Sequence, residues 1–222
     1  MDSLLRIGVV AHVSRTERAH ELMSTVGADY ISIDDGTLGC NRNHAHVLHE
    51  LSRTTQSYTV ILEDDCVPVD GFRDQMAAAI SAAPRCHYKD GNHCPAPIVS
   101  AYLGTGYPRY WQPGIGKAIQ KADALNAPWI LSEHLLHAVA YAIRTDLIAD
   151  LLQHRQQLPI DDMITEWARA NGHQVAYTYP SICDHQDGPT VITARVERRH
   201  PRHAHRTGTR TTWTGPTTTL EY

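Results

Sequence analysis

A short apolar run that ends in three consecutive acids does most to constrain the fold of this 222-residue chain. The run extends from Tyr58 to Leu62 and is followed directly by Glu63, Asp64 and Asp65. A stretch of Val, Ile and Leu bounded in this way is typical of a strand buried on both faces, as in a parallel sheet covered by helices. Proteins built on such sheets bind ligands beyond the carboxyl ends of the strands. We therefore expect an α/β protein with a polar site at the end of this strand.

The three acids predict a site for a hard divalent cation. Side chains alternate along a strand, so Glu63 and Asp65 are expected to point to one side and Asp64 to the other. Two adjacent carboxylates suit Mn²⁺ or Mg²⁺ shared with the phosphates of a substrate, because these ions prefer oxygen ligands. An acidic strand end that is merely solvated explains the same spacing, and the spacing alone leaves both interpretations open.

The rest of the chain alternates strand-like and helix-like segments, which is the pattern of a mixed, mainly parallel sheet flanked by helices. Further strands are expected at residues 4–11, 30–33, 98–103, 137–143 and 174–179, and helices at 15–26, 43–51, 72–82, 117–125, 146–153 and 161–170. After Gly188 the apolar periodicity fades, and the Thr-rich segment from Thr207 to Thr219 is expected to be irregular or partly ordered. We predict one catalytic domain at residues 1–187 and a basic, Thr-rich extension at 188–222.

Composition and charge narrow the class of protein. The formal net charge of −4 gives no overall signature of nucleic-acid binding, although six arginines gather between Arg195 and Arg210. No segment has the pattern of a signal peptide or an apolar run of about 18 residues that would span a bilayer. Five scattered cysteines, an odd number, argue against a disulfide framework. We expect a cytoplasmic protein without a membrane span.

Several short motifs occur in an order that resembles a known family. In chain order they are Gly36–His44 ahead of a helix, Leu62–Asp65, Tyr141–Ile143 and Leu158–Asp162. This order is similar to that of glycosyltransferase family 25, whose members carry Gly-Cys-x-x-Ser-His, Leu-Glu-Asp-Asp and Pro-x-Asp-Asp elements. The resemblance covers roughly residues 1–187 and extends to small glycosyltransferase-like proteins of bacteriophages. Asn43 stands where the family usually has Ser, and we assign it to the donor site with that difference.

The resemblance implies the A-type glycosyltransferase fold, a Rossmann-like α/β fold in which a nucleotide sugar lies across the strand ends. It also implies a divalent ion, Mn²⁺ or Mg²⁺, and a donor that is UDP-linked. Asp65 would be the direct metal ligand, and Glu63 or Asp64 would reach the ion through water or hold the ribose. In this fold a late loop usually supplies a third ligand, and His185, with Asp184 as the alternate, is the candidate here; an ordinary loop histidine is the competing explanation.

Residues at the ends of the first two expected strands are candidates for donor binding. His12, Ser14 and Arg15 follow the first strand, and the arginine fork suits a diphosphate. Asp34 or Asp35 follows the second, where a carboxylate suits a ribose or a base. Turn formation and helix capping explain Ser14 and Asp35 equally well.

Transfer to a hydroxyl acceptor needs a general base within hydrogen-bond reach of the acceptor oxygen. Asp161 and Asp162, at the start of an expected helix, are the candidates. Asp is also a favoured residue at helix starts, so one of the pair is expected to cap the helix while the other faces the cleft. Asp161 is the preferred base because the Pro-x-Asp-Asp element of the resembled family begins there, and the same resemblance favours inversion.

Two further segments contain ligand-type or aromatic residues. Cys86, His87, His93 and Cys94 surround an Asp-Gly turn, an arrangement compatible with zinc but also with a metal-free hairpin. The aromatic segment Tyr102–Trp111 is read as a wall of the acceptor site, with a buried strand and loop as the alternative.

The acceptor is left open by the sequence. The resemblance to phage proteins, together with the basic segment, favours a hydroxymethylated pyrimidine in DNA, reached by base flipping. A protein or glycan acceptor is an equal alternative. From other classes, the chain could be a non-catalytic metal- or nucleotide-binding module, or a metal-dependent nucleotidyltransferase or phosphodiesterase that uses the same acids.

Overall fold

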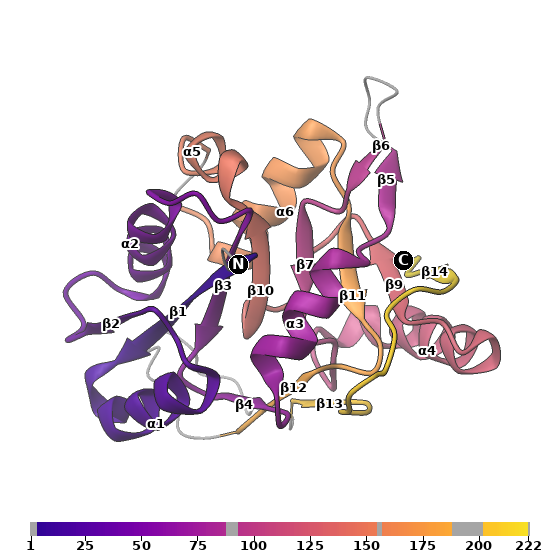
Figure 1. The fold of residues 1–222 in the computed structure, drawn as a ribbon, viewed down its shortest axis with the longest axis horizontal. Coiled ribbons are helices and arrows are strands. Elements are labelled where there is room, and N and C mark those ends of the chain that lie inside the picture. The colour runs from indigo at the N-terminus through magenta and orange to yellow at the C-terminus, as the bar shows by residue number, and fades with distance from the viewer. Residues whose placement is uncertain (1–3, 88–92, 155–156, 188–201, 222) are drawn as a thin grey trace.

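A computed structural model describes residues 4–87, 93–154, 157–187 and 202–221, and its centre is an eight-stranded sheet (Figure 1). The strand order is β14-β9-β11-β7-β10-β3-β1-β2. The strands are β1 (Leu5–His12), β2 (Tyr30–Asp34), β3 (Tyr58–Glu63), β7 (Ile98–Ser100), β9 (Trp129–Ser132), β10 (Ala140–Arg144), β11 (Val175–Thr178) and β14 (Thr217–Thr219).

The pairing of these strands places five carboxyl ends on one edge of the sheet. β1 is parallel to β2 and β3, and β7 is parallel to β11. β10 lies between β3 and β7 and is antiparallel to both, so β3 and β7 run the same way. β9 is antiparallel to β11, and β14 is parallel to β9. We call the edge where β1, β2, β3, β7 and β11 end the carboxyl edge.

Helices cover both faces of the sheet. They are α1 (Thr16–Val26), α2 (Cys40–Ser52), α3 (Phe72–Ser81), α4 (Gln112–Leu125), α5 (Ile148–Leu151) and α6 (Ile160–Asn171), with short 3-10 turns η1 (Val13–Arg15), η2 (Arg109–Trp111) and η3 (Thr145–Leu147). Apolar residues of α1 and α3 form one buried cluster with the sheet, and those of α2, α4, α5 and α6 form another. Figure 1 shows α3 in front of the sheet. The chain is therefore a mixed α/β protein, compatible with a Rossmann-like arrangement.

Three small strand pairs lie outside the main sheet. β4 (Cys66–Pro68) pairs with β12 (Cys183–His185), and β8 (Gly104–Thr105) pairs with β13 (His203–Ala204). β5 (Arg85–His87) and β6 (His93–Pro95) form a hairpin that projects from the body (Figure 1). β4, β12 and β13 gather at the same end of the molecule, where the acidic segment leaves β3.

The close approach of α2 to β1 depends on a glycine. A Cβ on Gly8 would collide with Val47 and would lie 2.7 Å from a methyl group of Leu51. Because Gly8 has no side chain, α2 rests directly on the backbone of β1. This packing sets the height of α2 above the ends of β1 and β3.

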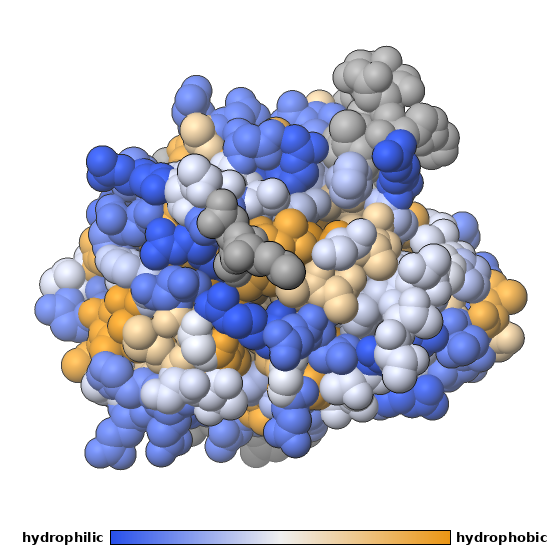
Figure 2. Space-filling model, in the orientation of Figure 1, coloured by the Kyte–Doolittle hydropathy of each residue, from blue (hydrophilic) through white to orange (hydrophobic). Residues whose placement is uncertain are grey.

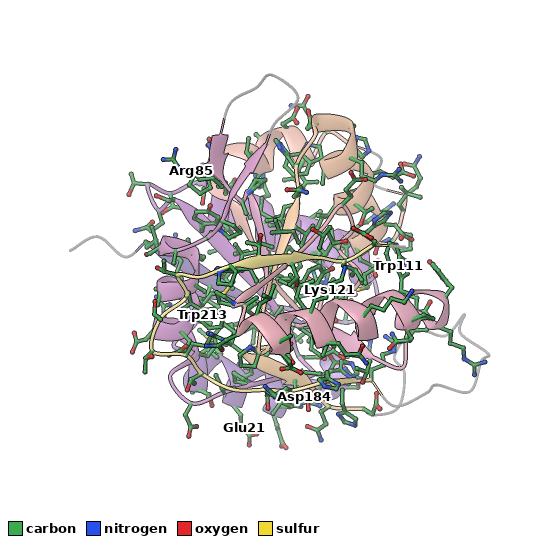
Figure 3. All side chains as sticks on the ribbon, turned by 90° about the vertical axis from the view of Figure 1, so that its right-hand side faces the viewer. Glu21, Arg85, Trp111, Lys121, Asp184 and Trp213 are labelled. Carbon is green, nitrogen blue, oxygen red and sulfur yellow. The ribbon has the colours of Figure 1, made fainter. Side chains whose placement is uncertain are left out.

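Two strands of the main sheet were not predicted from the sequence. No element is expected at Trp129–Ser132, which forms β9, and the Thr-rich segment expected to be irregular contributes β14 to the main sheet. Trp213 explains why this segment is ordered: its ring packs against that of Trp129, and the Trp129 indole donates to the Trp213 carbonyl at 2.8 Å. Figure 3 shows β14 running along the edge of the sheet beside α4. The terminal segment is therefore part of the core.

The surface is of mixed character. Figure 2 shows hydrophilic and hydrophobic residues interspersed over the face that carries α3. Among the described residues, no helix combines the length and the apolar character needed to cross a membrane.

Candidate functional site

Asp64 is buried and ties the end of β3 to the start of α1. One carboxylate oxygen accepts a hydrogen bond from the backbone N–H of His12 at 2.9 Å, and the other lies 2.6 Å from Arg15 Nη1. The same nitrogen of Arg15 lies 3.0 Å from Asp65 Oδ2. Burial opposes the charge on Arg15, but the two carboxylates outweigh it and raise the pKa of the guanidinium. Arg15, which the sequence predicts as a partner for a diphosphate, forms ion pairs with the acidic segment.

Asp65 and His185 meet at the carboxyl edge. His185 Nε2 lies 3.4 Å from Asp65 Oδ2, because β12 pairs with β4 and brings His185 opposite Cys66. Burial lowers the pKa of His185, but the Asp65 carboxylate more than offsets this and the net pKa is raised. Burial raises the pKa of Asp65, but His185 and Arg15 more than offset this, so the net pKa lies below the ordinary value. Asp65 Oδ1 is buried and accepts no hydrogen bond from any described residue.

Glu63 faces α2. Glu63 lies two residues after Ile61 in β3, so the two side chains point to the same face of the sheet. Ile61 belongs to the apolar cluster beneath α2. Glu63 Oε1 lies 3.2 Å from His44 Nε2, and His44 Nδ1 lies 3.0 Å from the Tyr141 hydroxyl. Burial lowers the pKa of the fully buried His44, but Tyr141, Cys40 and Glu63 together raise it well above the ordinary value. His44 therefore lies in a fixed orientation between Tyr141 and Glu63.

These contacts give Glu63 and Asp65 different partners, and the prediction that the two carboxylates share a cation stays a prediction. β3 ends at Glu63 and β4 begins at Cys66, so the backbone turns at Asp64 and Asp65 and strand alternation no longer applies. Asp65 faces His185, whereas Glu63 faces His44. In the part of the chain that the structure describes, the group of three metal-ligand atoms that lie within 4.8 Å of one another belongs to Cys40, His44 and Glu63.

Asp161 lies at the start of α6 on the same side as Glu63. Its Oδ1 accepts a hydrogen bond from the backbone N–H of Asp162 at 3.1 Å, so it contributes to the first turn of the helix. Burial, followed by the charges of Asp162 and Glu63, raises the pKa of Asp161 to about 6. Asp162 is exposed. A carboxyl group with this pKa suits proton transfer near neutral pH better than one of ordinary acidity.

The loop before α6 is fixed to the start of α2 by Asn41. The Asn41 side chain donates to the Leu158 carbonyl at 2.7 Å and accepts from the Ile160 backbone N–H at 3.1 Å. Sequence analysis gives Asn41 no role. This double hydrogen bond brings the Asp161 helix and the Cys40 helix together at one place.

His12 and Ser14, predicted to bind the donor, contact each other. His12 Nδ1 lies 2.8 Å from Ser14 Oγ and accepts from the Ser14 backbone N–H at 3.2 Å. The His12 side chain therefore caps η1, a local role that was not predicted for this residue.

Asp34 and Asp35 shape the turn that leads into α2. Both oxygens of the buried Asp34 accept backbone N–H groups at 2.9 Å, from Leu38 and Gly39. Asp35 is exposed and accepts from the Thr37 backbone N–H at 3.0 Å, and its hydrogen bonds with Thr37 lower its pKa. The structure assigns both acids to the turn before Cys40.

Asn43 is buried between α2 and the sheet. Its amide group donates to the carbonyls of Ala11 at 3.1 Å and Ser32 at 3.3 Å. The side chain thus fastens α2 to β1 and β2. Its predicted contact with the donor stays a prediction.

A second group of buried polar side chains lies behind His185. The ring centroid of Tyr102 is 5.1 Å from that of His137 and 6.3 Å from that of His185. The Tyr102 hydroxyl and His137 Nε2 are buried without a hydrogen-bond partner among the described residues. Burial lowers the pKa of His137 to about 3, so this imidazole is neutral. The sequence did not predict a place for His137 beside the site, because this residue belongs to a segment that was expected only to be a strand.

The described part of the basic segment is engaged with the body of the protein. The Arg202 guanidinium lies 4.8 Å from the ring centroid of Tyr107, and Arg206 forms an ion pair with Asp123 at 3.1 Å. Arg210 donates to the loop that follows α4. The portion of the segment before residue 202 lies outside the described residues, so its predicted contact with DNA stays a prediction.

The remaining predicted features are only partly placed. The side chains of Cys86, His87, His93 and Cys94 lie outside what the structure describes, although their backbone forms the β5–β6 hairpin.

In the aromatic segment predicted as an acceptor wall, Tyr102 and Trp111 are core residues, whereas Tyr110 is 65% exposed. Tyr110 lines a pocket with Lys117 and Lys121 of α4. The structure therefore agrees with the alternative reading, a buried strand and loop, for Tyr102 and Trp111.

Sequence analysis missed Cys40, His44 and Tyr141 as a group. Cys40 and His44 are four residues apart, the spacing that places two side chains on one face of a helix. That spacing was the available signal. Tyr141 carried none, because its contact with His44 depends on the order of strands in the sheet.

The chain matches no protein-family model and no curated protein. A solved structure described as the crystal structure of A197 from STIV aligns with a TM-score of 0.44 and 9% sequence identity, over 88% of this chain and 100% of that chain.

Proposed function

We propose that this protein is a metal-dependent glycosyltransferase of the A-type fold that moves a sugar from a nucleoside diphosphate donor, UDP-linked, to a hydroxyl acceptor. The observation that carries the proposal is the pairing of Asp65 with His185 at the carboxyl edge, where His185 Nε2 lies 3.4 Å from the carboxylate. Ligands of α/β proteins bind beyond this edge. The motif order that resembles glycosyltransferase family 25 supports the same conclusion.

The residues at this place fit a hard divalent ion. Asp65 Oδ1 is buried and accepts no hydrogen bond from a described residue, and a cation would satisfy it. Asp65 and His185 would hold Mn²⁺ or Mg²⁺ with donor phosphate oxygens completing the coordination. Bound there, the ion would stabilise the negative charge that develops on the diphosphate leaving group.

The protein's own groups have distinct tasks in this proposal. Asp64, which accepts the backbone N–H of His12, holds Arg15 at the edge, so that a positive charge lies beside the diphosphate position. Asp161 accepts the proton of the acceptor hydroxyl as its oxygen bonds to the anomeric carbon and the bond from that carbon to the diphosphate breaks. The raised pKa of Asp161, about 6, favours the proton transfer. Attack from the side of Asp161, opposite the diphosphate, inverts the anomeric centre.

The acceptor is proposed as a hydroxyl group without a narrower class. A hydroxymethylpyrimidine acceptor would require the basic segment to bind DNA. The described arginines of that segment contact Tyr107, Asp123 and the loop after α4. A protein or glycan acceptor needs no basic surface.

Calorimetry tests the donor site. A panel of nucleoside diphosphates and their sugars is titrated with and without Mn²⁺ into the wild type, Asp65→Ala and Asp146→Asn. Asp146 is exposed, follows β10 at the opposite edge of the sheet, and pairs with Arg144. We expect Mn²⁺-dependent binding of one nucleotide in the wild type and in Asp146→Asn, and its loss in Asp65→Ala. No binding of any nucleotide to the wild type would overturn the proposal.

A further inference from the structure

A transition-metal ligand set lies on the α2 side of the acidic segment, outside the donor site proposed above. Cys40, His44 and Glu63 each offer a ligand atom, and the three atoms lie within 4.8 Å of one another. Cys40 and His44 are separated by one turn of α2, and Glu63 is the last residue of β3. Two rigid elements therefore present one thiol, one imidazole and one carboxylate to a common point.

The distance between the His44 and Glu63 ligand atoms is close to that of tetrahedral coordination. Zinc binds imidazole nitrogen and carboxylate oxygen at about 2.0–2.2 Å, which places the two atoms about 3.4 Å apart at a tetrahedral angle. The observed distance between His44 Nε2 and Glu63 Oε1 is 3.2 Å. A shift of a few tenths of an ångström would admit the ion between them.

The outer contacts are those of a metal-ligating histidine. Such a histidine usually uses its second ring nitrogen to bond a neighbouring group, which fixes the orientation of the ring. His44 Nδ1 lies 3.0 Å from the hydroxyl of the fully buried Tyr141. His44 itself has no exposed surface. Tyr141 and the surrounding core therefore aim Nε2 at Glu63.

The position of Cys40 is also fixed, by the backbone turn that precedes it. The turn before Cys40 is held by Asp34, whose two oxygens accept the backbone N–H groups of Leu38 and Gly39. Gly39 adopts a φ of 75°, a conformation that favours glycine. Cys40 then opens α2 with its side chain exposed. The site is thus closed by protein on the His44 side and open to solvent on the Cys40 side.

A nucleophilic thiol relay would need a different arrangement. In such a relay the nucleophile and the orienting acid contact opposite nitrogens of the histidine. Here Nδ1 lies against the Tyr141 hydroxyl and Nε2 lies against Glu63, so such a relay would have to displace one of these two contacts to admit the thiol. The ligand atoms of all three residues nevertheless lie within 4.8 Å of one another, which is the proximity that common coordination needs.

We propose that Cys40, His44 and Glu63 form a zinc site with one open coordination position, separate from the hard-ion site at Asp65. A thiolate and an imidazole favour Zn²⁺ over Mg²⁺ or Mn²⁺, which prefer oxygen ligands. Three protein ligands with an open position on an exposed side are the composition of zinc sites that also bind water or a substrate atom. The proposal rests on these three side chains and holds whether or not the donor site is assigned correctly.

The test is Zn²⁺ titration of the untagged, reduced full chain against a chromophoric chelator. The wild type is expected to bind Zn²⁺ with the Cys40 site saturated first, and Cys40→Ser should weaken that binding at least 100-fold, roughly the upper limit for loss of an outer contact. Because Cys40 is exposed, the substitution is compatible with folding, which circular dichroism checks. Equal affinity in the wild type and Cys40→Ser would overturn the proposal, as would a wild type that binds no Zn²⁺.

Two controls separate this site from other candidates. Cys94→Ser removes a cysteine of the β5–β6 hairpin, and His49→Gln removes an exposed histidine of α2; both are expected to keep wild-type affinity. Loss of binding in Cys94→Ser with retention in Cys40→Ser would assign the zinc to the hairpin and overturn the proposal.

Tyr141→Phe tests the outer contact. Removing the hydroxyl should lower Zn²⁺ affinity about 10-fold without changing the stoichiometry. Unchanged affinity in this variant would overturn the role given to Tyr141.

Discussion

Glu63 and Asp65 are two residues apart, yet they belong to chemically different regions. Glu63 lies on the α2 side, where its partner His44 is fully buried and bonded to the hydroxyl of Tyr141. Asp65 lies on the β12 side, where its partners are the ionic groups Arg15 and His185. The first region combines a thiol, an imidazole and one acid, and the second is rich in carboxylates and fixed positive charge.

The difference shows what the end of a strand does to an acidic motif. While the chain is in β3, Glu63 must share a face with Ile61, and that face is covered by α2. Once the backbone turns at Asp64, the next acid is free to follow β4 toward β12. One short acidic run therefore serves two places, and substitutions should separate them.

The largest difference between the two regions is expected from Asp161→Asn. If the α2 side carries the proton transfer and the β12 side carries the donor, this variant should lose about 100- to 10,000-fold in transfer rate while donor affinity stays within a factor of two. Turnover with a labelled nucleotide sugar, beside calorimetry of the same nucleotide, makes the comparison. Equal loss of donor affinity and turnover would mean that the two sides are not functionally distinct.

Asp65→Ala and Cys40→Ser are expected to have smaller and opposite effects on nucleotide binding and on Zn²⁺ binding. Asp65→Ala should weaken Mn²⁺-dependent nucleotide binding at least about 100-fold, because it removes a direct ligand, and should leave Zn²⁺ affinity unchanged. Cys40→Ser should do the converse. Parallel titrations of both variants with both metals measure this, and loss of both metals in either single variant would join the two regions into one site.

Gly8→Ala should disturb the α2 side more than the β12 side. The added methyl group would meet Val47 and Leu51 and push α2 away from β1, at a cost of about 1–3 kcal/mol in the free energy of unfolding. Urea denaturation measures that cost, and Zn²⁺ affinity should fall while nucleotide affinity is retained.

Gly116→Ala is the matched control, since a Cβ there meets nothing within 4 Å and Gly116 lies inside α4. Alanine is the better helix former, so this variant should be neutral or slightly stabilised. A similar destabilisation in both variants would remove the role assigned to the contact between Gly8 and α2.

The smallest expected effect is a shift in pH dependence. Burial and the charges of Asp162 and Glu63 raise the pKa of Asp161 to about 6, so the base is ionised, and turnover is high, only above that pH. Asp162→Asn removes one of the negative charges, so the pKa falls and the acid limb of the pH–rate profile should move to lower pH. A shift to higher pH, or none, would show that another group controls the limb.

The same raised pKa has a defined effect on stability. The folded protein binds the Asp161 proton more tightly than the unfolded chain, so this group's contribution to stability decreases as pH rises from the ordinary Asp value through about 6. Asp161→Asn should therefore melt at a higher temperature than the wild type at pH 8, and the difference should shrink at pH 4.

Local patterns were sufficient to predict the parts of the site that follow strands directly. The apolar run before Glu63 indicates β3, and residues after parallel strands converge on one edge, which is how Asp65 and Arg15 could be placed together. His185 could be named for the same reason, because the expected last strand leads into its loop.

The parts that escaped depend on which elements become neighbours. His44 reaches Glu63 because α2 packs over β3, and Tyr141 reaches His44 because β10 inserts beside β3. Neither contact leaves a periodic signal in the sequence. The strand β14 was missed for a related reason: it has three Thr residues, and its order comes from pairing with β9 and from burial of Trp213.

The placement of β9 has a consequence for how the chain assembles. β1, β2 and β3 come from consecutive segments, whereas β9 pairs on one side with Val175–Thr178 and on the other with Thr217–Thr219. Contacts between segments far apart along the chain form late, because closing a long loop costs entropy before the contact is made. During synthesis and refolding, the half of the sheet that carries the acids is therefore expected to form first. Until the last segment arrives, the unpaired edge of β9 can pair with another nascent chain, which makes it the point at which aggregation is expected to begin.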